Sequence, residues 1–189
     1  MKLKKRQIRL LVTLLIAALG ALSVLTTPAK QQITQAVQTQ NPGLYQVDHA
    51  VDGDTIVVKS GDKTETVRFI GVDTPEEKDR RKPVQCYAQQ AADFTKQQVE
   101  NHQVRLEADS QGDNRDRYGR MLRYVYLSDG TLLNKKLVED GYGFAMTGFP
   151  FSKMSEFQAA GQQAQAQRKG AWGSCTISMA TGYPQTNPL

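Results

Sequence analysis

Short runs rich in β-branched and aromatic residues dominate the chain just beyond residue 43. They cover Leu44 to Val51, Thr55 to Lys59 and Thr64 to Val72. Such runs are typical of β-strands. The residues between the second and third runs, 60–63 (Ser-Gly-Asp-Lys), favour a tight turn, so these two strands are predicted to form a hairpin.

The spacing of apolar residues then changes from a strand pattern to a helical one. From Val84 to Asn101, small and apolar side chains fall on one face of a helix, namely Ala88, Ala91, Ala92, Thr95 and Val99. This spacing predicts a helix. Strand patterns return over Gln103 to Asp109 and over Met121 to Leu127.

Two more helices are predicted in the last third of the chain. The first covers Leu132 to Asp140 and is ended by Gly141. The second begins after Pro150 with Ser152 as its N-cap and ends at Gly170. Its inner face is expected to consist of Met154, Phe157, Gly161 and Ala164.

Five short strands with one helix after the third favour a small closed barrel over a sandwich. The predicted fold class is therefore α+β, mainly β: a five-stranded Greek-key barrel of the OB type with three helices. This fold commonly binds oligonucleotides, but a fold alone does not establish a function.

The N-terminal residues have the layout of an export segment. Cations up to Arg9 precede an uncharged run from Leu10 to Leu25, so residues 1–29 are predicted to be a cleaved signal peptide or a retained membrane anchor. Residues 30–43 hold five glutamines and no aromatic residue, which predicts a polar linker. We expect a folded domain over residues 44–175 and a flexible tail over 176–189.

The net charge is less informative than it first looks. The 189-residue chain has a formal charge of +5, which suggests nucleic acid or a membrane as partner. The excess lies in the N-terminal export segment, however, and the rest holds equal numbers of basic and acidic residues. This balance argues against a protein that coats duplex DNA non-specifically, and it predicts membrane contact only through the N-terminal segment.

The two cysteines, Cys86 and Cys175, lie near opposite ends of the expected domain. An even count in an exported chain favours a disulfide. Two unrelated free thiols are the alternative, and thiol titration distinguishes them.

Acidic residues gather in two short motifs. Asp52 and Asp54 are two residues apart, so in extended backbone both carboxylates point to one side and need a cation. In Asp73-Thr74-Pro75-Glu76 the proline fixes the direction of the Thr74 carbonyl. Asp54, Asp73 and that carbonyl form an all-oxygen set suited to Ca²⁺, whereas two histidines give little for zinc. Taken singly, each motif is also a common turn or helix start.

Arg68 interrupts an apolar strand, where an arginine needs a partner or a ligand. An ion pair with Asp73 or Glu76 is the structural alternative. Arg120 follows a glycine turn and is placed to join Arg68 in donating hydrogen bonds to a phosphate. Glu76 is then the candidate group for taking a proton from water.

One geometric requirement follows from the sequence spacing. Arg68 and Asp73 are five residues apart, so a regular strand would send their side chains to opposite faces. Both serve one site only if the strand ends or bulges between them, and Gly71 is the predicted place.

These motifs together carry a family resemblance. They are Asp52-Gly53-Asp54-Thr55, Arg68, Asp73-Thr74-Pro75-Glu76, Tyr118-Gly119-Arg120 and a helix end at Gly170-Ala171-Trp172-Gly173. With them in this order, the chain from about Tyr45 to Trp172 resembles the staphylococcal nuclease (thermonuclease) family. The resemblance implies an OB barrel with three helices, and Ca²⁺-dependent hydrolysis of DNA and RNA that leaves 3′-phosphate products.

The resemblance also implies a role for individual residues. It assigns catalysis to Arg68, Glu76 and Arg120. It assigns calcium binding to Asp54, Asp73 and Thr74, with Asp52 in the outer shell, and contact with a terminal phosphate to Arg117 and Tyr118. The chain departs from the family where two tyrosines flank the nucleotide, because Thr147 and Phe149 stand there instead. Phe149 can still stack on a base, but the tyrosine hydroxyl contacts are lost, which affects nucleotide affinity and base preference.

The leading hypothesis is an exported, monomeric, calcium-dependent nuclease that acts on single-stranded DNA or RNA. A non-catalytic OB module that binds nucleic acid at the cell surface is the second hypothesis. A structural envelope domain that uses Ca²⁺ only for stability is the third.

Overall fold

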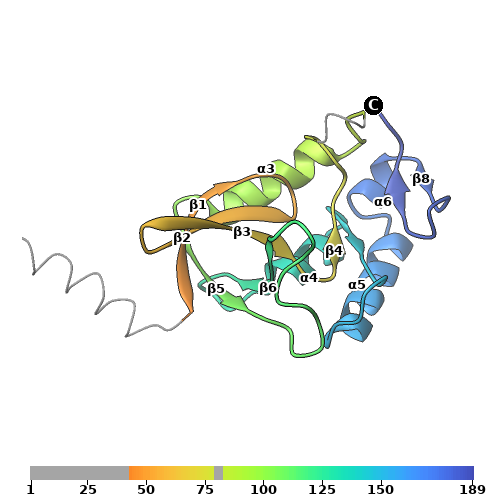
Figure 1. The fold of residues 1–189 in the computed structure, drawn as a ribbon. Coiled ribbons are helices and arrows are strands. Elements are labelled where there is room, and N and C mark those ends of the chain that lie inside the picture. Colours follow the sequence, from red (N-terminus) through yellow and green to blue (C-terminus); the bar gives the residue numbers. More distant parts are fainter. Residues whose placement is uncertain (1–42, 79–82) are drawn as a thin grey trace, which may run out of the picture. The chain divides into compact units, whose positions relative to one another are not determined.

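Five strands close into a barrel in the computed structural model, which describes residues 43–78 and 83–189 (Figure 1). They are β1 (Leu44–Ala50), β2 (Thr55–Ser60), β3 (Lys63–Phe69), β5 (Gln103–Glu107) and β6 (Met121–Tyr126). Their order around the barrel is β1-β2-β3-β6-β5. Neighbouring strands are antiparallel except β3 and β6, which are parallel. This arrangement confirms the predicted OB-type α+β barrel.

The barrel interior is filled by β-branched side chains that alternate along the strands. Ile56 and Val58 of β2 are fully buried, as are Val67, Val104 and Val125 on the neighbouring strands. Each such side chain contributes about 1.5–3 kcal/mol to stability when it leaves water. The β-branched runs that predicted these strands thus also supply side chains of the core.

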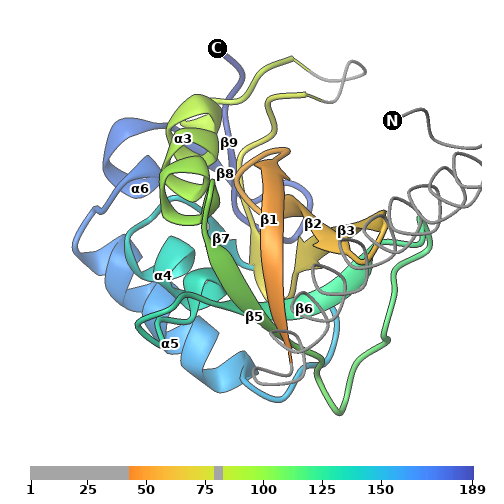
Figure 2. The ribbon, with the colours of Figure 1, turned by 90° about the vertical axis from the view of Figure 1, so that its left-hand side faces the viewer.

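Helices cover one side of this barrel (Figure 2). They are α3 (Ala88–Val99), α4 (Leu133–Glu139) and α5 (Met154–Ala166), with a single further turn at α6 (Ala171–Ser174). Helix α3 packs on β1, and α4 packs on α5. The three predicted helices are confirmed. Helix α3 begins later than predicted, because Tyr87 has a left-handed φ of 71° and residues 84–86 pair with the C-terminus instead.

Ser152 does not cap helix α5, contrary to the sequence prediction. The N-cap is Lys153, without a side-chain cap. The Ser152 hydroxyl and amide instead donate to Asp109 Oδ2 at 2.5 and 2.8 Å, and the Tyr124 hydroxyl donates to the same oxygen at 2.5 Å. Burial by itself would raise the pKa of Asp109, but these hydrogen bonds and one from the amide of Gln111 lower it well below the ordinary value. The Ser152 hydroxyl, which was predicted to cap α5, therefore donates to a carboxylate 43 residues away in the sequence.

Strand β3 ends at Phe69, and the chain turns before the short strand β4 (Val72–Asp73). Gly71 has a φ of +78°, and a Cβ there would lie 2.8 Å from the Phe151 ring. Strand β4 pairs with β7 (Phe144–Ala145) rather than extending the barrel. The predicted break at Gly71 is therefore present, and it allows residues on either side of it to face one site.

The segment after Cys175 is not a flexible tail, so that prediction is wrong. It forms a hairpin of β8 (Ile177–Ser178) and β9 (Gln185–Thr186), and Thr186 is buried. Its last residues pair with residues 84–86. In the structure Cys86 and Cys175 are joined, with their Cα atoms 6.0 Å apart. The hairpin has too few apolar residues to form a core of its own. Its pairing with residues 84–86 and the Cys86–Cys175 disulfide hold it against the rest of the domain.

The compact unit covers residues 43–189. It therefore extends further towards the C-terminus than the expected domain of residues 44–175. The predicted signal or anchor at 1–29 and all of the linker except Gly43 lie outside the described residues. Within residues 43–78 and 83–189, no helix is long and apolar enough to cross a membrane.

Candidate active site

The turn between β1 and β2 carries the first acidic motif. The Asp54 amide donates to Asp52 Oδ1 at 3.1 Å, and the Thr95 hydroxyl of α3 donates to the Gly53 carbonyl at 2.6 Å. A Cβ at Gly53 would lie within 2.7–2.9 Å of the Thr74 side chain. Glycine is therefore required here for close approach, which the sequence indicated only as a tight turn.

Asp54 is the buried centre of the site, with 2% of the residue exposed. Its Oδ2 accepts hydrogen bonds from the Thr74 amide at 2.9 Å and the Thr74 hydroxyl at 3.0 Å, and its Oδ1 accepts one from Thr55 at 3.1 Å. The carboxylate thus ties the start of β2 to the loop after β4. Because that loop also carries Glu76, Asp54 joins both acidic motifs.

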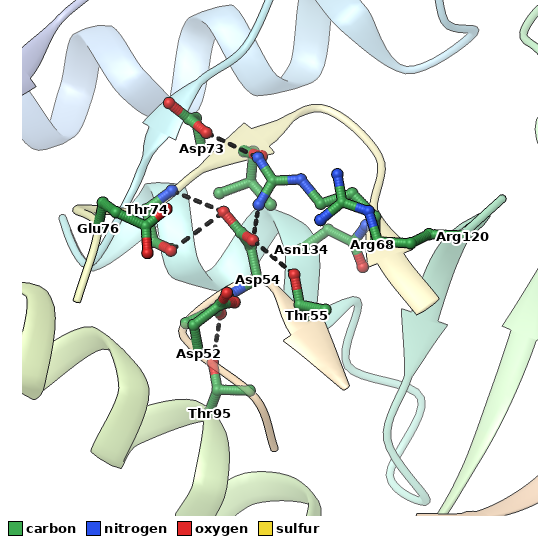
Figure 3. A network of polar contacts seen from close by, with 12 residues as sticks. Asp52, Asp54, Thr55, Arg68, Asp73, Thr74, Glu76, Thr95, Arg120 and Asn134 are labelled. Carbon is green, nitrogen blue, oxygen red and sulfur yellow. Dashed lines mark hydrogen bonds and ion pairs between the residues drawn. The ribbon is translucent and has the colours of Figure 1, made fainter. Parts of the chain in front are cut away.

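The Arg68 guanidinium lies between two carboxylates, as Figure 3 shows. One of its nitrogens contacts Asp54 Oδ1, and the other donates to Asp73 Oδ1 at 2.6 Å. The Arg68 side chain is only 19% exposed. The ion pair with Asp73 that the sequence offered as an alternative is present. It is compatible with a role in catalysis, because the same donors also suit a phosphate oxygen.

The pKa of Asp52 responds to the other charged residues of the site. Burial raises the pKa of the Asp52 carboxyl above its usual value, and Arg68 opposes this shift. Glu76 raises it further, and Arg120 lowers it. In the view of Figure 3, Glu76 lies beyond Asp54 on one side and Arg120 lies beyond Arg68 on the other. All the predicted central residues therefore belong to one cluster.

Glu76 follows Pro75 in a segment without helix or strand. The Lys78 amide donates to Glu76 Oε1 at 2.9 Å. The Glu76 main chain is held by Gln85, whose side-chain Oε1 accepts from the Glu76 amide at 2.7 Å. Sequence reasoning missed Gln85, because a hydrogen bond between residues nine positions apart leaves no local pattern.

Arg120 is positioned by Asp116, another residue that the motif analysis missed. Asp116 Oδ2 accepts from Arg120 Nε at 2.7 Å, and its Oδ1 accepts from the amides of Tyr118 and Arg120. Gly119 completes the turn with a φ of +82°. Burial would raise the Asp116 pKa, but the hydrogen bonds from Arg120 and Tyr118 lower it overall. An acidic residue four positions before Arg120, at the start of a glycine turn, was the available signal.

The predicted substrate-binding rings lie at the surface, and Tyr118 lies next to Arg120 of this cluster. Tyr118 is 65% exposed, and Arg117 donates to its hydroxyl at 2.7 Å. The guanidinium carbons of Arg117 and Arg120 lie 4.8 and 5.5 Å from the centre of the Tyr118 ring. Phe149, which follows β7, is 71% exposed, whereas Thr147 is half-buried. Exposed rings of this kind suit stacking on bases.

Comparison with known proteins decides the family. The family model described as "Staphylococcal nuclease homologue" matches residues 66–174, more than half of the chain. The thermonuclease of Staphylococcus hyicus is 38% identical over 161 residues, which covers 84% of this chain and 94% of the relative. The thermonuclease of Staphylococcus intermedius is 40% identical over 129 residues, or 68% and 75% of the two chains. This chain belongs to the staphylococcal nuclease family.

Membership of the staphylococcal nuclease family makes the chain a nuclease, a hydrolase of phosphodiester bonds. A third relative, endonuclease YncB of Bacillus subtilis (strain 168), is 38% identical over 128 residues, which covers 67% of this chain and 60% of that protein. The family likeness thus extends to proteins named as endonucleases. The residues matched by the family model include the cluster members Arg68, Asp73, Thr74, Glu76 and Arg120.

The staphylococcal nuclease family is metal-dependent, which raises the question of which donors at the site suit a cation. Among the described residues, no group of three or more histidine, cysteine, aspartate or glutamate side chains is arranged to hold a metal ion. Two carboxylates, Asp54 and Asp73, nevertheless converge on one positive group, Arg68, and the Thr74 carbonyl follows directly in the chain. Such an all-oxygen set fits a hard cation that keeps water among its ligands. A cation held by these groups would compete with Arg68 for the same carboxylate oxygens.

Proposed function

We propose that this protein is an exported nuclease that requires Ca²⁺ and hydrolyses both DNA and RNA to products with a 3′-phosphate. The carrying observation is the convergence of Asp54 and Asp73 on Arg68. Glu76 and Arg120 appear in the same view of the site as these residues (Figure 3), and their charges shift the pKa of the Asp52 carboxyl in opposite directions. The presence of acidic, basic and proton-accepting groups in one region supports hydrolysis of a phosphodiester, which uses all three.

Asp54, Asp73 and the Thr74 carbonyl are the residues proposed to hold Ca²⁺, with Asp52 behind them. A bound Ca²⁺ supplies positive charge beside the phosphate oxygens. The sequence argument for Ca²⁺ rests on oxygen donors, and the family likeness supports metal dependence without identifying the ion.

The protein's own groups have separate tasks in the proposed hydrolysis. Glu76 accepts a proton from the attacking water, whose oxygen forms a new bond to phosphorus. Arg68 and Arg120 donate hydrogen bonds to phosphate oxygens as negative charge builds up on them. The bond from phosphorus to the 5′ oxygen breaks, that oxygen leaves as a hydroxyl after taking up a proton, and the phosphate stays on the 3′ side.

Surface side chains are proposed to hold the rest of the nucleic acid. Arg117 and Tyr118 are assigned to a terminal phosphate, and Phe149 is assigned to a base. Tyr118 and Phe149 are both exposed, which supports contact with a strand outside the central cluster. Stacking on such rings tolerates every base, so it agrees with a nuclease of broad specificity.

Export is proposed from the cations and the apolar run within residues 1–29. The protein is then secreted or anchored at the outer face of the membrane, and the membrane is contacted only through this segment. The joined cysteines agree with an oxidising location. We propose a monomer, because the sequence carries no signature of an interface.

The test is to incubate the purified protein with single-stranded DNA or RNA, in Ca²⁺ or in a calcium chelator, and to follow fragment size and end groups. Cleavage of both substrates to 3′-phosphate ends only in Ca²⁺ is expected. Binding without cleavage would favour the non-catalytic OB module. Thermal stabilisation by Ca²⁺ without cleavage would favour the structural domain. Full activity in chelator would reject the requirement for Ca²⁺.

A further inference from the structure

Gln85 and Glu76 are nine residues apart in the sequence and are joined by two hydrogen bonds. The Glu76 amide donates to the Gln85 side-chain oxygen at 2.7 Å, and the Gln85 amide donates to the Glu76 carbonyl at 2.9 Å. Glu76 lies in a segment that has no helix or strand to fix its backbone. These two bonds therefore tie the Glu76 main chain to Gln85 on both its amide and its carbonyl side.

Gln85 is in turn held by the C-terminal end of the chain. It forms a bridge with Pro188, while the Cys86 amide donates to the Asn187 carbonyl at 2.8 Å and the Leu189 amide donates to the Val84 carbonyl at 2.9 Å. Residues 84–86 and 187–189 thus form a short antiparallel ladder. The last three residues of the chain serve as a partner strand for Gln85.

The sulfur bridge fastens this ladder to the rest of the domain. Cys86 is the residue next to Gln85, and Cys175 directly precedes the C-terminal hairpin. The Thr176 amide donates to the Asn187 side-chain oxygen at 3.0 Å, and the Asn187 amide donates to the Thr176 carbonyl at 3.0 Å. The bridge and the hairpin therefore hold Gln85 through the same few residues.

We propose that Gln85 is a positioning residue for Glu76, and that the Cys86–Cys175 disulfide makes the nuclease activity depend on an oxidised C-terminal hairpin. The inference rests on the proposed role of Glu76 as the group that accepts a proton from water. A general base must lie within hydrogen-bond reach of that water. A shift of about 1 Å in such a group lowers turnover by about 100-fold.

The hydrogen bond is tested with Gln85→Met, which keeps the length of the side chain and removes the acceptor. Gln85→Glu keeps an acceptor oxygen and serves as the rescue variant. Gln90→Met on the exposed face of α3 is the matched control. We expect Gln85→Met to lower kcat by about 10- to 100-fold, with KM within about twofold of the original. Gln85→Glu should recover most of this loss, and the control should behave as the unmodified protein.

The disulfide is tested with the double variant Cys86→Ser/Cys175→Ser, alone and combined with Gln85→Met. Near-UV circular dichroism, measured below the melting temperature of each variant, identifies the folded fraction to which kcat is normalised. Thiol titration of the unfolded, unreduced protein should find no free thiol. If the disulfide acts through Gln85, its removal lowers kcat in the original background by about 10-fold or more and adds little in the Gln85→Met background.

The outcomes separate this inference from the proposed function. Calcium-dependent cleavage by the unmodified protein, with loss of turnover in Glu76→Gln, is established first, and its absence would reject the proposed function itself. If both hold and Gln85→Met keeps its kcat, the positioning role is overturned. Two free thiols, or losses of kcat that simply multiply in the combined variant, would overturn the link from the disulfide to Gln85.

Discussion

Replacing Arg68 by methionine tests whether one guanidinium neutralises the acidic cluster. Methionine keeps the apolar length of the side chain and removes the charge. The Asp54 carboxylate, in a residue 2% exposed, then loses its ion-pair partner inside the protein. The Asp73 side chain is 40% exposed, so water replaces much of what it loses.

The size of the effect follows from this difference in burial. Removing one partner of a buried ion pair costs about 3–5 kcal/mol, whereas an exposed pair contributes at most about 1 kcal/mol. Asp54 keeps its hydrogen bonds from Thr55 and Thr74, which favours the lower end. We expect Arg68→Met to lower the free energy of unfolding by about 3 kcal/mol without Ca²⁺. This is a large part of the roughly 5–15 kcal/mol that stabilises most domains.

Urea denaturation in chelator and in Ca²⁺ provides the measurement. Ca²⁺ at about 100 times its dissociation constant stabilises a folded protein by about 2.7 kcal/mol. In the original protein the cation has to compete with Arg68, whereas in Arg68→Met it replaces the missing charge. The difference in the free energy of unfolding between the original protein and Arg68→Met should therefore become smaller when Ca²⁺ is added.

Arg115→Met is the matched control. Arg115 pairs with Glu65 at 2.9 Å, but their side chains are 42% and 33% exposed. The expected loss is below about 1 kcal/mol and independent of Ca²⁺. A loss in Arg68→Met as small as in this control, or a difference that Ca²⁺ leaves unchanged, would refute the reasoning.

Four further predictions concern single residues. Glu76→Gln should stay folded by near-UV circular dichroism and lose at least about 100-fold in turnover of single-stranded DNA; near-normal turnover would contradict its role. Gly71→Ala should lower the free energy of unfolding in urea by about 1–3 kcal/mol or more, because its φ is +78° and the methyl group overlaps the Phe151 ring; an unchanged denaturation midpoint would count against this. The pKa of Asp109 is lowered in the folded state, so its contribution is complete above about pH 4 and is lost as pH falls. The stability difference between the original protein and Asp109→Asn should therefore shrink in urea denaturation from about pH 6 to about pH 3, and a constant difference would disagree. Phe149→Ala should raise KM by about 5- to 100-fold through lost stacking, with stability within about 0.5 kcal/mol; an unaltered KM would remove Phe149 from the binding surface.

The barrel was predictable because its strands carry their own pattern. Their runs of β-branched residues predicted the strands, and residues of these runs such as Ile56 and Val58 are the ones that the barrel buries. The break at Gly71 was predictable as well, since Arg68 and Asp73 had to face one site and only an interrupted strand allows that. Local chemistry was sufficient wherever the determining contact lay within a few residues.

Long-range hydrogen bonds were the part that the sequence did not indicate. Serine is a residue type typical of an N-cap, but the Ser152 hydroxyl donates to Asp109, 43 residues away. Gln85 lies in a segment predicted as helix and pairs instead with Glu76 and the chain end. The C-terminal hairpin has too few apolar residues to predict an ordered structure, because its order comes from partners far along the chain. These contacts depend on the finished fold, and no local spacing encodes them.

The parallel pairing of β3 and β6 has a consequence for the nuclease while it is being synthesised. Arg68 stands opposite Leu122 in this ladder, two residues beyond Arg120. A nascent chain that ends before β6 already carries Asp54, Asp73 and Glu76, yet its barrel is open and Arg120 has no place beside Arg68. Arg68 and Arg120 therefore reach their positions in the barrel only after β6 has been made, so the residues proposed for catalysis come together late in synthesis of the domain.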